Sequence, residues 1–248
     1  MHKIIMAVAT LTFFLPATIN AASAQDFTAA QKEQIQEMFK EYLVNNGEVI
    51  LESVNKYQGE LVAKEAAVAN EKAAGFVKEL SGRTDLATAG NPEGDITIVE
   101  FFDYNCGYCT RALEEIQVIL KEDKNVRVVF MDMPILGPQS LEASKWSLAA
   151  REQGKYWEYH RAIMTHQGPK NEAALEKLAK ELKLDIDKLK KDKDSEEIAA
   201  TLNQNIEEAQ ALNIRGTPGF IIGEEVAPGY IPAEQMKKII AEQRKNNG

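Results

Sequence analysis

Residues 96–109 read ITIVEFFDYNCGYC, and this stretch decides the fold. Its first seven residues are mostly apolar and β-branched or aromatic, which predicts a strand buried on both faces. A helical pattern of apolar residues begins directly after Cys109. The sequence therefore predicts that Cys106 and Cys109 lie where a buried strand gives way to a helix.

The segments that follow predict how this unit continues. A second apolar run at 126–133 stops at Pro134, so strand, helix and parallel strand form a βαβ unit. Downstream come a helical block at about 140–212, the turn-forming Gly216-Thr217-Pro218, an apolar run at 220–222, a turn at 223–225, a short strand at 226–227 and an amphipathic helix from about 232. Within the helical block, Asn171 and Asp194 are expected to cap helices. The order predicts an α/β thioredoxin fold with a helical insertion at about 138–212.

The chain has two cysteines, three positions apart. A bridge between Cys106 and Cys109 would close too short a loop to constrain the unfolded chain, so a purely structural disulfide explains the pair poorly. A helix start offers unpaired N–H groups and the positive end of the helix dipole, which lower the pKa of Cys106. The thiolate attacks disulfides, and Cys109 can then displace the partner. We expect a redox pair in which Cys106 attacks and Cys109 resolves.

A metal site is the competing interpretation of the two cysteines. Structural zinc needs four cysteine or histidine ligands, and beyond residue 24 the chain offers only His160 and His166 besides the pair. Their spacing of six places them on different faces of a helix, so packing or surface roles are expected for both. No metal and no other cofactor is therefore predicted. A copper ion held by the two thiols stays open as a minor role.

Glu100 lies six residues before Cys106, inside the predicted buried strand. A buried carboxyl without a partner is costly as an anion and tends to stay protonated. It could lie beneath the cysteine pair and exchange protons with Cys109. The alternative is a residue at a strand end that meets solvent or a lysine.

Thr217-Pro218 is the second candidate site motif. A proline can start a strand, and an X-Pro bond can be cis. In a thioredoxin fold this bond lies beside the cysteine pair, so the Thr217 backbone could bind an extended substrate while Pro218 shapes the groove. Gly107 and Tyr108, between the cysteines, complete the predicted substrate-binding set.

The first 24 residues resemble a secretory signal. A basic start precedes the apolar stretch Ile4–Leu15, and Ala22-Ser23-Ala24 fits a cleavage site after Ala24. A membrane anchor is the alternative, but the apolar stretch is short for a bilayer. The formal net charge of −9 argues against nucleic acid or an anionic membrane as the main partner. An exported, periplasmic protein is expected.

Residues 26–80 are predicted to be helical. Thr28 and Gln31 fit a capping box, and Asn45-Asn46-Gly47 ends the first helix. Beyond it, apolar residues follow spacings of four and three, and a period of 3.5 favours packing against other helices, including copies of the chain. This pattern has two parts: Ile50, Val54, Tyr57 and Leu61, and then Val62, Ala66, Ala69, Ala73, Phe76 and Leu80. The alternative is two helices folded back on the main domain. We expect 25–80 to be an oligomerisation region and 81–248 the catalytic domain.

Three motifs together resemble the DsbA-like thioredoxin superfamily, over about residues 85–248: Glu100-Phe101-Phe102, Cys106-Gly107-Tyr108-Cys109 and Gly216-Thr217-Pro218. Residues 26–80 are similar to the N-terminal region of the suppressor-of-copper-sensitivity protein C group (ScsC) and the Com1-like proteins, some of which form oligomers. The resemblance implies a nucleophilic Cys106, a resolving Cys109, an acidic partner at Glu100 and a cis Pro218. It also implies exported substrates with cysteines, a membrane redox partner that resets the pair, and a homodimer or homotrimer.

Three functions fit these expectations. A protein disulfide isomerase is favoured because Thr217 before the proline resembles the isomerases, and several active sites in one oligomer suit reshuffling. A monomeric oxidase that donates its disulfide is the alternative within the same chemistry. The Gly107-Tyr108 dipeptide departs from the Pro-His of the best-known oxidases, and in the family this dipeptide tunes the redox potential. A copper-binding or copper-tolerance protein using the same thiols is the third.

Overall fold

The computed structural model describes residues 26–247, so the predicted signal sequence at 1–24 lies outside the described residues. The described chain divides into two compact units, which meet between Gln58 and Gly59, within one helix. Each unit is described by itself. Within residues 26–247, no helix combines the length and the apolar character needed to cross a membrane.

The first unit consists of α1 (Ala29–Asn45) and the beginning of α2 (Gly47–Leu80). The predicted capping box is confirmed: the Gln31 N–H donates to Thr28 Oγ1 at 3.3 Å, and the Thr28 N–H donates to Gln31 Oε1 at 2.9 Å. Asn46 ends α1, and its side-chain amide donates to the Tyr42 carbonyl. No side chain of α1 is buried.

The second unit contains a five-stranded sheet in the order β1-β3-β2-β4-β5. The strands are β1 (Thr88–Gly90), β2 (Ile96–Phe102), β3 (Val126–Asp132), β4 (Gly219–Ile222) and β5 (Glu225–Pro228). β2 and β3 are parallel, whereas the other neighbouring strands are antiparallel. The predicted βαβ and ββα halves are therefore present. The three-residue edge strand β1 was not predicted, because it contains no apolar run.

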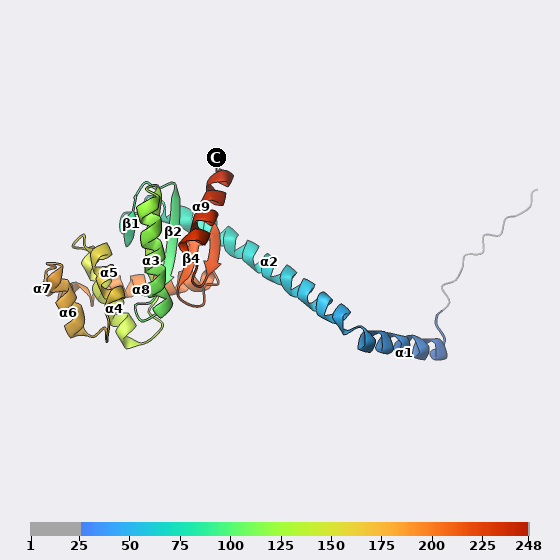
Figure 1. Ribbon diagram of the computed structural model, residues 1–248. Coiled ribbons are helices and arrows are strands. Elements are labelled where there is room, and N and C mark those ends of the chain that lie inside the picture. The colour runs from blue at the N-terminus through green and yellow to red at the C-terminus, as the bar shows by residue number, and fades with distance from the viewer. Residues whose placement is uncertain (1–25, 248) are drawn as a thin grey trace, which may run out of the picture. The chain divides into compact units, whose positions relative to one another are not determined.

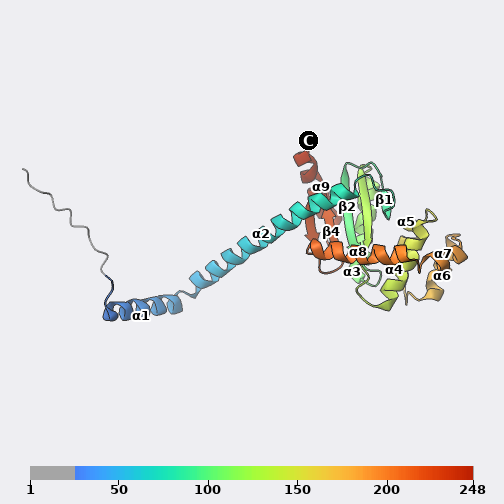
Figure 2. The same ribbon diagram turned by 180° about the vertical axis from the view of Figure 1, so that it is seen from behind.

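Helices cover both faces of this sheet (Figures 1 and 2). α3 (Gly107–Glu122) and α9 (Ala233–Asn247) lie on one face, while the end of α2 and α8 (Glu196–Ala211) lie on the other. Alternate residues of β2 supply the two cores: Ile98 and Phe102 belong to the core under α3, and Val99 and Phe101 to the core under α2. The buried strand predicted at the start of the sequence motif is thus the centre of the fold.

In the last three turns of α2, the regularly spaced apolar residues pack on the sheet. Ala73, Phe76 and Leu80 are buried against the sheet, and the Phe76 ring stacks on Phe101 with centroids 6.3 Å apart. Lys72 adds a hydrogen bond to the carbonyl of Ala211 at 3.2 Å. This part of the helix packs on the sheet, and the assembly of copies through residues 25–80 stays a prediction. The period predicted a packed face but carried no information about what covers it.

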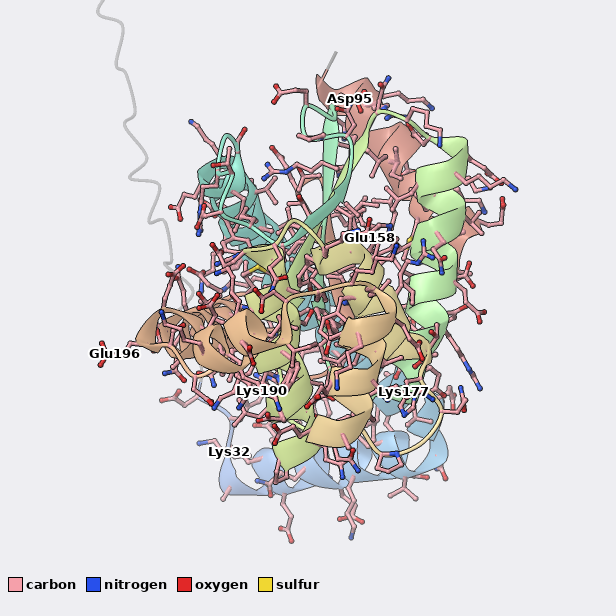
Figure 3. All side chains as sticks on the ribbon, turned by 90° about the vertical axis from the view of Figure 1, so that its left-hand side faces the viewer. Lys32, Asp95, Glu158, Lys177, Lys190 and Glu196 are labelled. Carbon is pink, nitrogen blue, oxygen red and sulfur yellow. The ribbon has the colours of Figure 1, made fainter. Side chains whose placement is uncertain are left out.

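The helical insertion comprises α4 to α7 and leads into α8. The four helices are α4 (Pro138–Arg151), α5 (Tyr156–Thr165), α6 (Glu172–Glu181) and α7 (Ile186–Asp192). Asn171 caps α6, as predicted. The expected cap at Asp194 is wrong, because Ser195 caps α8 and Asp194 pairs with Lys145 instead. Figure 3 views the insertion side, with Lys177 of α6 and Lys190 of α7 labelled.

Candidate active site

The loop between β2 and α3 is held by Asp103, which is fully buried. Its Oδ1 accepts hydrogen bonds from the Asn105 N–H and the Ser140 hydroxyl, both at 2.7 Å, and its Oδ2 accepts the Leu136 N–H at 2.9 Å. The loop is thereby fixed to the start of the insertion. Sequence reasoning missed Asp103. The signal was present, because an aspartate followed two residues later by a free N–H is an Asx-turn pattern.

Cys106 is the N-cap residue of α3, and Cys109 lies one turn inside the helix. Both are free thiols. Cys106 keeps 8% of its surface exposed, whereas Cys109 is 0% exposed. Of the two cysteines, only Cys106 is therefore accessible to a partner in solution.

Hydrogen bonds to the ionised sulfur lower the pKa of Cys106 to about 5. The largest cause is the Cys109 thiol; the side chain of Thr217 and the N–H groups of Cys109 and Tyr108 add to it, while burial opposes them. In its thiol form, Cys106 donates to the Thr217 carbonyl at 3.3 Å. At neutral pH, Cys106 is consequently a thiolate.

The pKa of Cys109 moves in the opposite direction. It is raised because the proton is held in the hydrogen bond to Cys106, because the sulfur is buried, and because the charge of Glu100 opposes a second anion. The pair is therefore asymmetric, with an ionised outer sulfur and a protonated inner one. Cys109 needs a proton acceptor before it can act as a nucleophile.

Glu100 lies in the middle of β2 and is 1% exposed. Of the two alternatives considered for it, the buried position is the one observed. Its Oε1 has no hydrogen-bond partner. Burial raises the pKa of Glu100 to about 8, and the negative charges of Cys106 and Asp132 add to the effect. Glu100 is thus a carboxyl that can give or take a proton near neutral pH, and its catalytic role stays a prediction.

The loop before β4 brings Thr217 to Cys106, although 111 residues separate them in sequence. The Thr217–Pro218 bond is cis, as the resemblance implied. Gly219 follows, and a Cβ there would lie 2.4 Å from Cγ2 of Ile214. Only glycine allows this close approach, so the residue after Pro218 is restricted by packing.

Tyr108 forms the exposed side of the site and has 57% of its surface accessible. The guanidinium of Arg111 lies 5.2 Å from its ring centroid, and the ring of Tyr230 lies 6.2 Å away. The start of α3 and the loop before β4 bring together six of the predicted site residues: Cys106, Gly107, Tyr108, Cys109, Thr217 and Pro218. Glu100, the seventh, lies in β2, where its charge acts on Cys106 and Cys109. Their individual roles remain predictions.

The two histidines lie outside this cluster. His160 is buried in α5, and its Nδ1 is 3.0 Å from the Tyr104 hydroxyl. His166 ends α5 as its C-cap residue. Within residues 26–247, no group of three or more His, Cys, Asp or Glu side chains is placed to hold a metal ion.

Residues 97–241 match the family model of the DSBA-like thioredoxin domain. The chain belongs to the DsbA-like thioredoxin family. Domains of this family are of the thiol–disulfide oxidoreductase type, and the predicted fold and resemblance are both confirmed.

Two solved structures of similar proteins extend this assignment. The thioredoxin-like oxidoreductase from Silicibacter pomeroyi DSS-3 is 41% identical, with a TM-score of 0.65 over 67% of this chain and 96% of that one. ScsC of Proteus mirabilis, in a transitional conformation, is 25% identical, with a TM-score of 0.64 over 89% of this chain and 98% of that one. The DsbA-like chain therefore resembles ScsC over most of its length.

A curated relative matches part of this chain over a small share of its own length. The Na(+)/H(+) antiporter NhaA 3 of Salinispora tropica is 30% identical over 135 residues, which is 54% of this chain. The chain spans about a fifth of the length of the curated relatives it matches. The likeness therefore concerns only a part of each protein.

Proposed function

We propose that this protein is a thiol–disulfide oxidoreductase of the periplasm that acts as a protein disulfide isomerase on exported proteins. The redox activity rests on one observation: the ionised Cys106 sulfur is partly exposed beside the protonated, buried thiol of Cys109. A thiolate is the attacking species in disulfide exchange, and a nearby thiol is the group that can release the partner.

The chemistry follows from this asymmetry. The Cys106 thiolate attacks one sulfur of a substrate disulfide, so that a mixed disulfide forms and the other substrate sulfur leaves as a thiolate. In isomerisation, a substrate thiolate attacks the substrate sulfur bound to Cys106, a new substrate disulfide forms, and the Cys106 thiolate is regenerated without net oxidation. In the reductive branch, Cys109 gives its proton to Glu100 and attacks Cys106. The Cys106–Cys109 disulfide forms, and the substrate leaves with both sulfurs reduced.

A membrane redox partner is proposed to reset the pair after each reductive cycle. It would reduce the Cys106–Cys109 disulfide with two electrons and one proton, regenerating the Cys106 thiolate and the Cys109 thiol that isomerisation needs. If the protein acts as an oxidase instead, the partner would remove two electrons.

The surface beside Cys106 suits a peptide segment. The Thr217 carbonyl is available when Cys106 is ionised, because a thiolate cannot donate to it. Ile135 and Leu136 are 44% and 52% exposed, and the Leu136 N–H is bound to Asp103 of the active-site loop. Exposed apolar side chains anchored to the active-site loop, and a free carbonyl beside Cys106, are features that an extended chain can use for contact and for hydrogen bonding.

Replacing Cys109 by serine is expected to trap the substrate. Cys106 would still attack, but the serine hydroxyl cannot displace the bound partner, so the mixed disulfide should accumulate as the main protein species. Incubation with a scrambled disulfide protein followed by non-reducing mass spectrometry measures this adduct. The double variant Cys106→Ser/Cys109→Ser is the matched control and should form none. Equal adduct in single and double variants would contradict the assigned order of attack.

We further propose that residues 26–58 assemble copies of the chain. On α1, Met38, Phe39 and Tyr42 are 68%, 64% and 53% exposed, and on α2, Tyr57 is 62% exposed. Burying a large apolar side chain contributes about 1.5–3 kcal/mol of favourable free energy. Association that covers these side chains is therefore strongly favoured. The spacing Ile50, Val54, Tyr57, Leu61 fits helix-to-helix packing, and a second copy offers the matching surface.

The size of the protein in solution tests the assembly and the isomerase assignment together. The chain 25–248 is expected to be a dimer or trimer, and Val54→Asp/Tyr57→Asp should shift it to monomer. The control Lys56→Asp, at an exposed position of the same helix, should leave the size unchanged. The monomeric variant should lose reshuffling of scrambled disulfides by about tenfold or more while keeping single-disulfide exchange. A monomeric parent protein that only oxidises reduced peptides would replace the isomerase proposal with the oxidase alternative.

A further inference from the structure

A second acid is buried on the same face of the sheet as Glu100. In the parallel register of β2 and β3, Glu100 is opposite Phe130 and Phe102 is opposite Asp132. Side chains two positions apart on a strand share a face, so Glu100 and Asp132 are diagonal neighbours beneath α3. Asp132 is 0% exposed. The active site therefore stands above two buried carboxyls, not one.

The surroundings of Asp132 do not neutralise its charge. Its Oδ2 accepts the Tyr156 hydroxyl at 3.3 Å, while its Oδ1 has no partner. Burial raises the pKa of Asp132 to about 7, and the charge of Asp103 adds to the rise. Within residues 26–247, no salt bridge includes either buried carboxyl. Both acids consequently change protonation near neutral pH.

The polar groups around the Asp132 carboxyl come from the active-site loop and from two helices of the insertion, while Asn205 of α8 donates to the Asp132 main-chain carbonyl at 3.1 Å. They are Asp103 and Tyr104 of the active-site loop, Ser144 of α4, and Tyr156 of α5. The Tyr104 hydroxyl donates to Ser147 at 2.5 Å and lies 3.0 Å from His160 Nδ1. Burial lowers the pKa of His160 to about 3, so this histidine is neutral and supplies no cation. Glu100 in turn faces Cys106 and Cys109 of α3, and Phe220 of β4 is its apolar neighbour.

We propose that Asp132 is a positioning residue for proton transfer, whose negative charge makes Glu100 a stronger base toward the thiol of Cys109. This proposal rests on the proposed function of the cysteine pair. Two neighbouring buried carboxyls resist being ionised together, so a charged Asp132 favours the protonated state of Glu100. Glu100 then takes the proton from Cys109 Sγ more readily. The resulting thiolate attacks Cys106 Sγ, the Cys106–substrate bond breaks, and the substrate leaves as a thiolate.

The first test is a direct titration of Glu100 in the reduced, full chain. Carboxyl carbons of labelled glutamate are followed by NMR against pH, and the resonance missing from Glu100→Gln identifies Glu100. Asp132→Asn removes one charge with little change of shape, so the Glu100 midpoint should fall by about one pH unit. Asp187→Asn removes an equal charge from the exposed surface of α7 and should leave the midpoint unchanged.

A kinetic readout follows the same proton. The rate at which Cys109 releases a bound peptide thiol should rise with pH as Glu100 loses its proton, and Asp132→Asn should move this rise to lower pH by the same amount. Tyr156→Phe removes the hydrogen bond that favours the Asp132 anion, so it should lower the Glu100 midpoint by a smaller step. Added to Asp132→Asn, it should have no further effect.

An unchanged Glu100 midpoint in folded Asp132→Asn would overturn the proposal. If Asp132→Asn fails to fold, Tyr156→Phe provides the same test, and an unchanged midpoint there has the same meaning. The titration needs no turnover, so it separates this proposal from the proposed function. A shifted Glu100 midpoint in a protein without exchange activity would contradict only the proposed function.

Discussion

The Cys106→Ser variant is expected to lose thiol–disulfide exchange at pH 7 by at least about a thousandfold. A serine hydroxyl does not ionise near neutral pH, so the helix start that stabilises the sulfur anion has no anion to stabilise. Recovery of activity by a scrambled disulfide protein measures isomerisation, and reduction of a disulfide-bonded peptide measures the single exchange. Both should fall to the rate without protein.

Cys109→Ser is the matched control for this loss, because it makes the same cysteine-to-serine change three positions further along the chain. It should keep the first attack and fail at release, whereas Cys106→Ser should fail at the first step. Substantial exchange by Cys106→Ser would place the nucleophile elsewhere and would remove the basis of the proposed function.

The second large predicted effect is a low pKa of the Cys106 thiol. Thiolate absorbance and alkylation rate should both show a midpoint near pH 5 for Cys106 in the reduced protein. At pH 7 such a group carries roughly thirtyfold more thiolate than an ordinary cysteine with a pKa of about 8.5. Thr217→Ala should raise the midpoint, because the Thr217 side chain stabilises the anion. A midpoint above pH 8 in the parent protein would contradict the geometry of the site.

The lowered pKa also predicts how stability depends on pH. The folded, reduced protein loses the Cys106 proton at about pH 5, whereas the unfolded chain keeps it until about pH 8.5. Between these values the unfolded state binds more protons at this sulfur, so the contribution of Cys106 to the stability of the reduced form grows with pH and is lost as pH falls through 5. The raised pKa values of Glu100 and Asp132 act in the opposite direction, so the comparison with the oxidised form isolates the contribution of Cys106. The oxidised form has no such thiol. Denaturant midpoints of both forms should therefore separate as pH rises through this window.

The junction of β2 and α3 could be predicted because its signals are local. An apolar β-rich run, a C-x-x-C spacing and an acid six residues earlier all lie within fourteen residues. The contact between Cys106 and Thr217 required the fold as an intermediate step. It was reached from the order of the elements and not from a local pattern.

The parts that could not be predicted depend on tertiary contacts. The partners of Asp103 and Asp132 lie 37 and 24 residues away along the chain, at Ser140 and Tyr156. The end of α2 shows the limit of periodicity, since its apolar face has the same spacing whether a sheet or another helix covers it. Asp194 and Ser195 are both good capping residues, and only the backbone decides between them.

The hydrogen bonds of Asp103 limit where the helical insertion can be exchanged between members of this family. Because its carboxylate binds Leu136 and Ser140, the first turn of the insertion is also a support of the nucleophile loop. A chimera that joins a foreign helical block after Pro134 would cut this support even if every catalytic side chain were kept. A junction placed beyond Ser140 would preserve this support. The suitable junction for exchanging insertions therefore lies inside α4 and not at its start.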